Sequence, residues 1–393
     1  MLFGFLLLNL TSVLSQVASR STGGGGQNEA RAETTIDLPE ISSSIRLSSS
    51  EVKLNTAGAY PRLAKLSDGS ILSVQTLYNV NGSYNVLQVS KSTDNGQSFD
   101  YFGEIVRGAH KDIDNGFLLE LPQAQESRAP PVILAAYRNH DMEKPGAEPT
   151  YYRITVSRSE DGGRTWKDAV DVVGQNAAES KGMGLWEPSM RVGADGGVQL
   201  MYSGEITDAE QEIFRAVSHS EGREWSEPVN LHVHSLGRQF RDGMQSVVAV
   251  KDQGNGKDTL VMVVECKIGW QVHVDYMLSY DDGASWWNRS TIYDPKGADR
   301  SAGAPQIANF GDGVALTFMT DEDTTTVDWP KNSTTKALFS NGVRDGKMQW
   351  SKKPVLLDAS PSWWPGLLTT ANNEVMAVYG HDGSPRGKVI KTN

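Results

Sequence analysis

Short runs in which apolar and polar residues alternate recur along most of the chain and predict β-strands. The alternation is clear at residues 84–89, 152–156 and 275–278, and a period of two residues turns one face of each strand towards a core. Beyond the N-terminus, no window keeps a helical period for more than about three turns. The pattern therefore predicts an all-β protein.

A short motif follows several of these runs and returns at a nearly constant interval. Three copies read Ser-Thr-Asp-Asn-Gly-Gln-Ser-Phe at 92–99, Ser-Glu-Asp-Gly-Gly-Arg-Thr-Trp at 159–166 and Ser-Tyr-Asp-Asp-Gly-Ala-Ser-Trp at 279–286. A fourth copy at 218–225 has Ser220 in place of the aspartate, and 344–350 resembles an eroded fifth. The central positions are 59 to 67 residues apart. A period of about 60 residues indicates an array of equivalent modules.

The motif has the chemistry of a tight turn. Its aspartate can accept hydrogen bonds from nearby backbone N–H groups, and its glycine can adopt a positive φ. The closing aromatic side chain is large enough to fix the turn on the core between neighbouring modules. The motif resembles the Asp-boxes of sialidase-like β-propellers. The resemblance implies that these turns stabilise the fold and take no part in catalysis.

One repeat array accounts for nearly all of the 393 residues. We predict an all-β, six-bladed β-propeller of the sialidase-like type, with four-stranded blades of about 55–60 residues. The last blade is too short, so residues 36–54 should supply its missing strand and close the ring. We assign residues 1–20 to a signal peptide, 21–35 to a flexible leader and 36–393 to the propeller. The predicted blades start near Tyr60, Asp112, Trp186, Arg241, Gly303 and Trp363.

The N-terminus indicates secretion. Residues 2–14 form a short apolar run followed by small polar residues, which is typical of a cleaved signal peptide and too short to span a bilayer. Secretion makes the sequons at Asn81, Asn288 and Asn332 candidate glycosylation sites. The only cysteine is Cys266, so the chain has no internal disulfide.

Charge and histidine content narrow the choice of partners. A formal net charge of −11 argues against nucleic acid and against an anionic membrane. His232 and His234 form a His-x-His pair, but without companion ligands such a pair is typical of an exposed strand or loop. We therefore expect neither a metal nor a cofactor.

In a propeller of this type the ligand lies over the central axis, near the starts of the innermost strands. Flat aromatic faces beside hydrogen-bonding groups suit sugar rings. The residues predicted to bind substrate there are Tyr60, Arg62, Trp186, Arg241, Asp242, Trp363, Trp364 and Tyr379.

Two glutamates are candidate catalytic residues. Glu187 lies at the start of the inner strand of blade three, and Glu265 ends the apolar run 260–264. A carboxylate at the end of a buried strand should face a cavity or a partner. Cleavage of a glycosidic bond needs two carboxyl groups that face each other across it. An ordinary salt bridge at the rim is the alternative for either residue.

Four segments give a closer resemblance: 59–63, 185–188, 241–244 and 263–265. They resemble the exo-α-1,5-L-arabinanases of glycoside hydrolase family 93, which are secreted six-bladed propellers, over essentially the whole mature chain. The resemblance implies release of arabinobiose from the non-reducing end of linear arabinan by a retaining mechanism. It also implies two catalytic glutamates that match Glu187 and Glu265, with their individual roles open. Relatives carry a tyrosine near the start of blade six, where this chain has Trp363 and Trp364.

Two other functions stay open. A sialidase would need three arginines, for which Arg62, Arg241 and Arg300 are candidates, and a tyrosine nucleophile; the missing tyrosine in blade six argues against it. A non-catalytic carbohydrate-binding propeller would not need both glutamates. In each case the partner is a polysaccharide or oligosaccharide, and we expect a secreted monomer.

Overall fold

The computed structural model describes residues 33–392, except 123–129, 236 and 298. In this part of the chain every regular element is a β-strand, apart from one short 3-10 turn at Pro39–Ile41. No helix within it is long and apolar enough to cross a membrane. The predicted signal peptide lies outside the described residues, as does most of the predicted leader.

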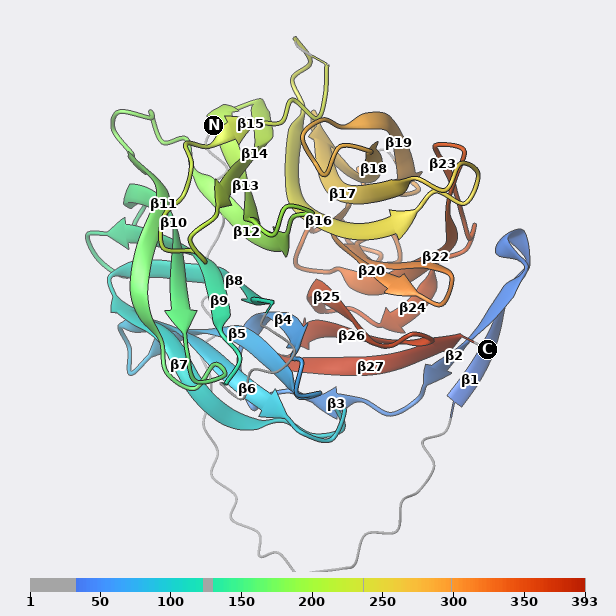
Figure 1. Ribbon diagram of the computed structural model, residues 1–393, viewed down its shortest axis with the longest axis horizontal. Helices are drawn as coiled ribbons and strands as arrows, with labels where there is room; N and C mark the ends of the chain where they lie inside the picture. The colour runs from blue at the N-terminus through green and yellow to red at the C-terminus, as the bar shows by residue number, and fades with distance from the viewer. Residues whose placement is uncertain (1–32, 123–129, 236, 298, 393) are drawn as a thin grey trace, which may run out of the picture.

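The strands form six antiparallel units that follow one another around a ring (Figure 1). One eight-stranded sheet holds two of these units, joined by a single parallel pair between Gln211 and Arg241. From the centre outwards, the first three units are β4 (Ala59–Lys65), β5 (Ile71–Val80), β6 (Tyr84–Ser92) and β7 (Asp100–Ala109); β8 (Lys111–Glu120), β9 (Ile133–Met142), β10 (Pro149–Ser159) and β11 (Lys167–Asn176); and β12 (Leu185–Val192), β13 (Val198–Thr207), β14 (Glu210–Ser218) and β15 (Val229–Asn230).

The last three units complete the ring. They are β16 (Arg241–Lys251), β17 (Asp258–Ile268), β18 (Gln271–Ser279) and β19 (Trp287–Tyr293); β20 (Ala302–Phe310), β21 (Gly313–Thr320), β22 (Thr334–Arg344), β23 (Lys347–Trp350) and β24 (Val355–Asp358); and β25 (Ser362–Ala371), β26 (Glu374–His381) and β27 (Ser384–Thr392). Each unit begins within one residue of the predicted blade start, which confirms the predicted six-bladed arrangement.

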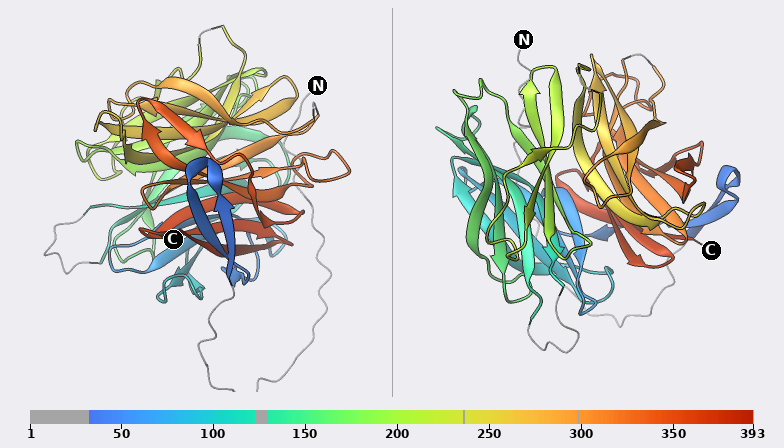
Figure 2. Two further views of the ribbon diagram at one scale, coloured as in Figure 1. Left: turned by 90° about the vertical axis from the view of Figure 1, so that its right-hand side faces the viewer. Right: turned by 45° about the horizontal axis from the view of Figure 1, so that its top comes forward.

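The N-terminal segment closes the last blade, as predicted. Strands β2 (Ser43–Ser48) and β3 (Val52–Lys53) both pair with β27, and β1 (Glu33–Leu38) adds to the outer side of β2 (Figure 2). Ile45 and Leu54 are almost completely buried in this blade. The propeller begins before the predicted boundary at residue 36, because β1 starts at Glu33.

The closing aromatics of the repeated turns lie between blades. Each packs against the apolar cluster shared by its own blade and the preceding one, so the predicted structural role of these side chains is confirmed. The five side chains in this position are Phe99, Trp166, Trp225, Trp286 and Trp350.

The hydrogen bonds of the turns also match the prediction. Asp161 Oδ1 accepts bonds from the backbone N–H groups of Arg164 and Thr165 at 3.1 and 2.9 Å. Gly163 has φ of +91° and donates its N–H to the Ser159 hydroxyl at 2.8 Å. The carboxylate of Asp161 also accepts the hydroxyls of Ser159 and Thr165, at 2.8 and 2.6 Å, so the turn is fixed from within the motif.

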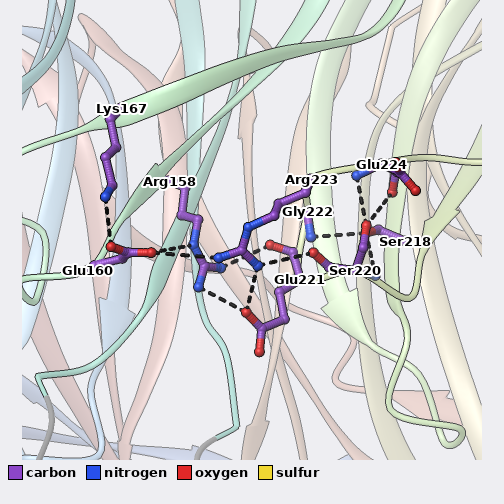
Figure 3. A network of polar contacts seen from close by, with 9 residues as sticks. All are labelled: Arg158, Glu160, Lys167, Ser218, Ser220, Glu221, Gly222, Arg223 and Glu224. Atoms are coloured by element: carbon purple, nitrogen blue, oxygen red, sulfur yellow. Dashed lines mark hydrogen bonds and ion pairs between the residues drawn. The ribbon is translucent and has the colours of Figure 1, made fainter.

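The fourth copy, which lacks the aspartate, is held differently (Figure 3). Its Ser220 hydroxyl accepts one backbone N–H, that of Glu224, at 2.8 Å. Arg158 of blade two donates to the carbonyl and the carboxylate of Glu221, at 3.0 and 2.9 Å, as Arg191 of blade three does to Asp282 in the copy at 279–286. The turn therefore keeps the contact between blades but has fewer hydrogen bonds from its own central side chain.

Candidate functional site

The innermost strands share one irregularity, and it positions the candidate site. Each of the six contains a β-bulge, and one residue in each bulge has φ between 50° and 54°. Positive φ is uncommon for residues other than glycine, and bulges at sheet edges redirect side chains. We call these six the bulge residues: Tyr60, Asn115, Glu187, Met244, Ala304 and Trp364.

Glu187 is the bulge residue of β12. Residues of the next blade form hydrogen bonds to both its carboxylate and its backbone carbonyl. Its Oε2 accepts the backbone N–H of Met244 at 3.1 Å and the hydroxyl of Ser203 at 3.0 Å. Its backbone carbonyl accepts the side-chain amide of Gln245 at 2.7 Å. The half-buried carboxyl group is therefore fixed by β13 and β16.

Glu265 lies on β17, opposite Gly243, and is held in the same manner. Its Oε2 accepts the backbone N–H of Ala304, the bulge residue of the following blade, at 2.8 Å. A Cβ on Gly303 would lie 2.5 Å from this oxygen, so only glycine permits the contact. Gly243 has the equivalent place beside Glu187, where a Cβ would come within 3.2 Å of Oε2.

The two carboxyl groups influence each other's protonation. Burial, together with the nearby charge of Glu187, raises the pKa of Glu265 to about 7. Burial also raises the pKa of Glu187, but hydrogen bonds from Met244 and Ser203 and the charges of neighbouring arginines oppose the rise. Two such groups cannot both ionise freely near neutral pH, so one of them retains a proton.

An apolar group of side chains lies beside the glutamates and is drawn from several blades. Tyr60, Met244, Ala304 and Met319 are buried in it, and the indoles of Trp329, Trp363 and Trp364 pack against them. Trp329 was not among the predicted site residues. It nevertheless lies close to Glu265, because a Cβ on Gly303 would be 3.1 Å from the Trp329 ring and 2.5 Å from Glu265 Oε2. Of the predicted residues, Tyr60, Trp363 and Trp364 thus come together.

Arg62 is buried under this group. Its guanidinium lies 3.9 Å from the centre of the Tyr60 ring, and Nη1 donates to the carbonyl oxygens of Pro61 and Trp364 at 2.9 and 3.2 Å. Its Nη2 makes no hydrogen bond to any described residue. This unpaired donor is itself buried, so it is closed to solvent in this structure.

Trp186 belongs to a polar group on blade two and the start of blade three. The guanidinium of Arg138 lies 5.2 Å from its ring and donates to the carboxylates of Asp112 and Asp114 at 2.9 and 3.1 Å. The charge of Arg138 also lowers the pKa of Glu187 against the effect of burial. Tyr78 donates to Asp114 at 2.6 Å.

The structure does not support two of the predicted binding residues. Asp242 is fully buried, and both of its oxygens accept bonds from Arg289 at 2.7 Å. Tyr379 is fully buried between blades five and six, where its hydroxyl donates to Glu51 at 2.7 Å. Neither side chain can reach a ligand on the axis, so we remove both from the candidate site. Arg241 is close enough for its charge to affect both glutamates.

Among the sequons, Asn81 and Asn288 are exposed and Asn332 is half-buried. Glycosylation at these positions stays a prediction.

The fold was also compared with known proteins. No family model and no curated protein matches the sequence. Solved structures match closely, among them the α-L-arabinanase of Penicillium chrysogenum in complex with arabinobiose, with a TM-score of 0.60 and 17% identity over 86% of this chain and 94% of that one.

Two further matches have the same architecture. The GH93 α-L-arabinofuranosidase of Fusarium graminearum with arabinobiose has a TM-score of 0.59 and 18% identity, over 87% of this chain and 96% of that one. The NanB sialidase (K499G mutant) of Streptococcus pneumoniae has a TM-score of 0.55 and 11% identity, over 84% and 68%. The protein is therefore a β-propeller of the sialidase-like type; identities this low establish the fold alone.

Proposed function

We propose that this protein is a glycoside hydrolase in which Glu187 and Glu265 form the catalytic pair. The observation that carries the proposal is the electrostatic coupling of two half-buried carboxyl groups whose pKa values are both raised by burial. Paired carboxyl groups of different proton affinity are what glycosidic bond cleavage requires. We propose further that the substrate is linear α-1,5-arabinan, and the product arabinobiose. The resemblance of four sequence segments to the arabinanases supports this, together with matched structures that contain arabinobiose.

The environments of the two glutamates support separate roles in a retaining mechanism. Glu265, with a pKa of about 7, keeps its proton in mildly acidic solution and acts as general acid and base. Glu187 accepts two hydrogen bonds on one oxygen, which favour its ionised form, and acts as nucleophile. Attack by Glu187 on the anomeric carbon gives a glycosyl-enzyme while Glu265 protonates the leaving oxygen. Water, deprotonated by Glu265, then releases the product.

The surroundings favour a neutral sugar. Arg241 is bound by Glu205 and by Gln211, and Arg300 donates to the carbonyl of Asp321 at 2.8 Å. Arg241 and Arg300 are thus engaged by protein groups and Arg62 is buried, whereas a sialidase needs all three for the substrate carboxylate. Burial also raises the pKa of Tyr60, which lies in the apolar group beside the pair, and this disfavours a phenolate nucleophile.

We also propose that the protein is secreted and acts as a monomer on extracellular polysaccharide. The apolar N-terminal run of the sequence supports secretion.

A substrate panel tests the proposed function. Purified protein is incubated with linear arabinan, a fluorogenic sialoside and intact pectin, and products are separated by chromatography. Release of arabinobiose from linear arabinan alone is the expected result. Sialoside cleavage without action on arabinan would assign the function to a sialidase. Carbohydrate binding without any cleavage would assign it to a non-catalytic propeller.

A further inference from the structure

A second cluster of ionisable side chains lies at the junction of blades three and four. Glu210 and Glu212 are two residues apart on β14, so they share one face of that strand. His234 comes from the segment between β15 and β16. One ligand atom from each of the three lies within 4.8 Å of the other two. Glu212 and His234 are only 2% and 7% exposed.

The orientation of the His234 ring is fixed by Asp242. Nδ1 lies 2.8 Å from Asp242 Oδ2, and the same carboxylate accepts two bonds from Arg289. An ionised carboxylate can only accept, so Nδ1 carries a proton and donates it. Nε2 then points to the other side, where Glu212 Oε1 lies 3.3 Å away. A histidine that donates one ring nitrogen to a carboxylate is the usual arrangement of a metal ligand.

Two atoms at the centre of this cluster have no hydrogen bond to the described residues. They are Nε2 of His234 and Oε2 of Glu212, and both are buried. Burying a carboxylate without compensation is costly. The surrounding carboxylates belong to Glu210, Glu212 and Asp242, and among the described residues Arg289 is the only arginine bonded to them. A cation among the three ligands would satisfy both unpaired atoms at once.

We propose that Glu210, Glu212 and His234 bind one divalent transition metal ion, with Asp242 as the group that orients His234. A mixed set of imidazole and carboxylate donors suits Zn²⁺ better than Mg²⁺ or Ca²⁺, which prefer oxygen ligands alone. The His-x-His pair has no companion ligand nearby in the chain, so the sequence alone predicts no metal there. The fold supplies the companions from β14.

The ion joins parts of the chain that support the candidate catalytic site. Blades three and four share one sheet through the single pair Gln211 and Arg241. Gln211, between the two glutamate ligands, donates to the carbonyl of Asp242 at 2.8 Å. Asp242 in turn lies two residues before Met244, whose N–H binds Glu187. The metal therefore stabilises the junction behind the nucleophile.

The test uses the full chain after treatment with a chelator and dialysis. Calorimetric titration with Zn²⁺ should give one ion per chain, with much weaker binding of Mg²⁺. At a hundredfold excess over the dissociation constant, Zn²⁺ should raise Tm by about 2–5 °C. Anomalous diffraction at the zinc edge should place the ion beside His234 Nε2.

Matched variants distinguish Zn²⁺ binding at the proposed ligands from Zn²⁺ binding elsewhere on the protein. Glu212→Gln and Glu210→Gln should lose the Zn²⁺-dependent rise in Tm, whatever their Tm without metal. His232→Gln, at the exposed neighbouring histidine, should keep it. His273→Gln removes a member of a second group, Cys266, His273 and Asp275, and should keep it too. Absence of stoichiometric Zn²⁺ binding, a rise that survives Glu212→Gln, or loss in either control variant would overturn the proposal.

Discussion

The carboxylate of Glu187 accepts a hydrogen bond from the backbone N–H of Met244, the residue at the bulge of the next inner strand. Glu265 has the same relationship to Ala304, one blade further on. In both cases the residue before the bulge is a glycine, Gly243 or Gly303, which lets the carboxylate approach the backbone. The two candidate catalytic groups are thus supported by one repeated structural device, and the repeat of the fold itself positions the chemistry.

The close contact between Gly303 and Glu265 predicts that one added methyl group at Gly303 lowers kcat. In Gly303→Ala the new Cβ would lie 2.5 Å from Glu265 Oε2, so the carboxyl group must move. We expect kcat to fall by about 10- to 100-fold, because a displacement of about 1 Å in a catalytic group has effects of this size. The control is Gly380→Ala, whose Cβ meets nothing closer than 3.6 Å. Equal activity of both variants would show that the contact does not position Glu265.

The proposed roles predict which variant a small nucleophile can rescue. Glu187→Gln lacks the nucleophile, so added azide should attack the anomeric carbon directly and partly restore turnover of an activated arabinoside. The product should be a glycosyl azide of inverted configuration, which NMR can identify. If Glu265→Gln yields the inverted azide instead, the roles are reversed.

The raised pKa of Glu265 predicts how stability depends on pH. The folded protein holds this proton up to about pH 7, whereas the ordinary value for glutamate is 4.5. The folded state therefore binds more protons between these values, and its stability falls as the pH rises through them. Glu265→Gln does not titrate, so at pH 8 it should be more stable than the wild type by about 1–3 kcal/mol.

Denaturant unfolding of both proteins at pH 4 and pH 8 measures this difference. At pH 4 the advantage of Glu265→Gln should largely vanish, because the wild-type carboxyl group is then protonated in both states. The control is Glu143→Gln, at an exposed position. A stability difference that is the same at both pH values would contradict the assignment.

Ring closure by the N-terminal segment predicts a large cost for one buried side chain. Ile45, which is 1% exposed, packs in the cluster between blades five and six. Ile45→Ala should lower the free energy of unfolding by about 2–5 kcal/mol through lost burial and a cavity. Thr34→Ala, on the exposed part of β1, should change it by less than about 0.5 kcal/mol. Similar unfolding midpoints for the two variants would mean that the segment does not stabilise the ring.

The architecture could be predicted from the sequence because its signals are local. Strand alternation recurs around the ring and the turn motif recurs in the first five blades, so a weak copy can be identified from the others. The bulges have a weaker signal: proline follows Tyr60, Glu187, Ala304 and Trp364, but not the other two bulge residues.

The misplaced residues depend on contacts that no local pattern contains. Asp242 follows a site residue directly, yet its partner Arg289 comes from the far edge of the same blade. Tyr379 lies on the second strand of blade six, but Glu51 of the N-terminal segment binds its hydroxyl in the interior. Trp329 lies in a connection between strands, where periodicity gives no position at all.

The central claim is that Glu187 and Glu265 together cleave arabinan. It is tested most directly by following arabinobiose release from linear arabinan for the wild type, for each glutamine variant and for the double variant. The account predicts that each single variant loses several orders of magnitude in kcat and that the double variant loses little more, because the two residues act as a unit. All variants should keep the wild-type circular dichroism spectrum. Robust release of arabinobiose by the double variant would contradict the account.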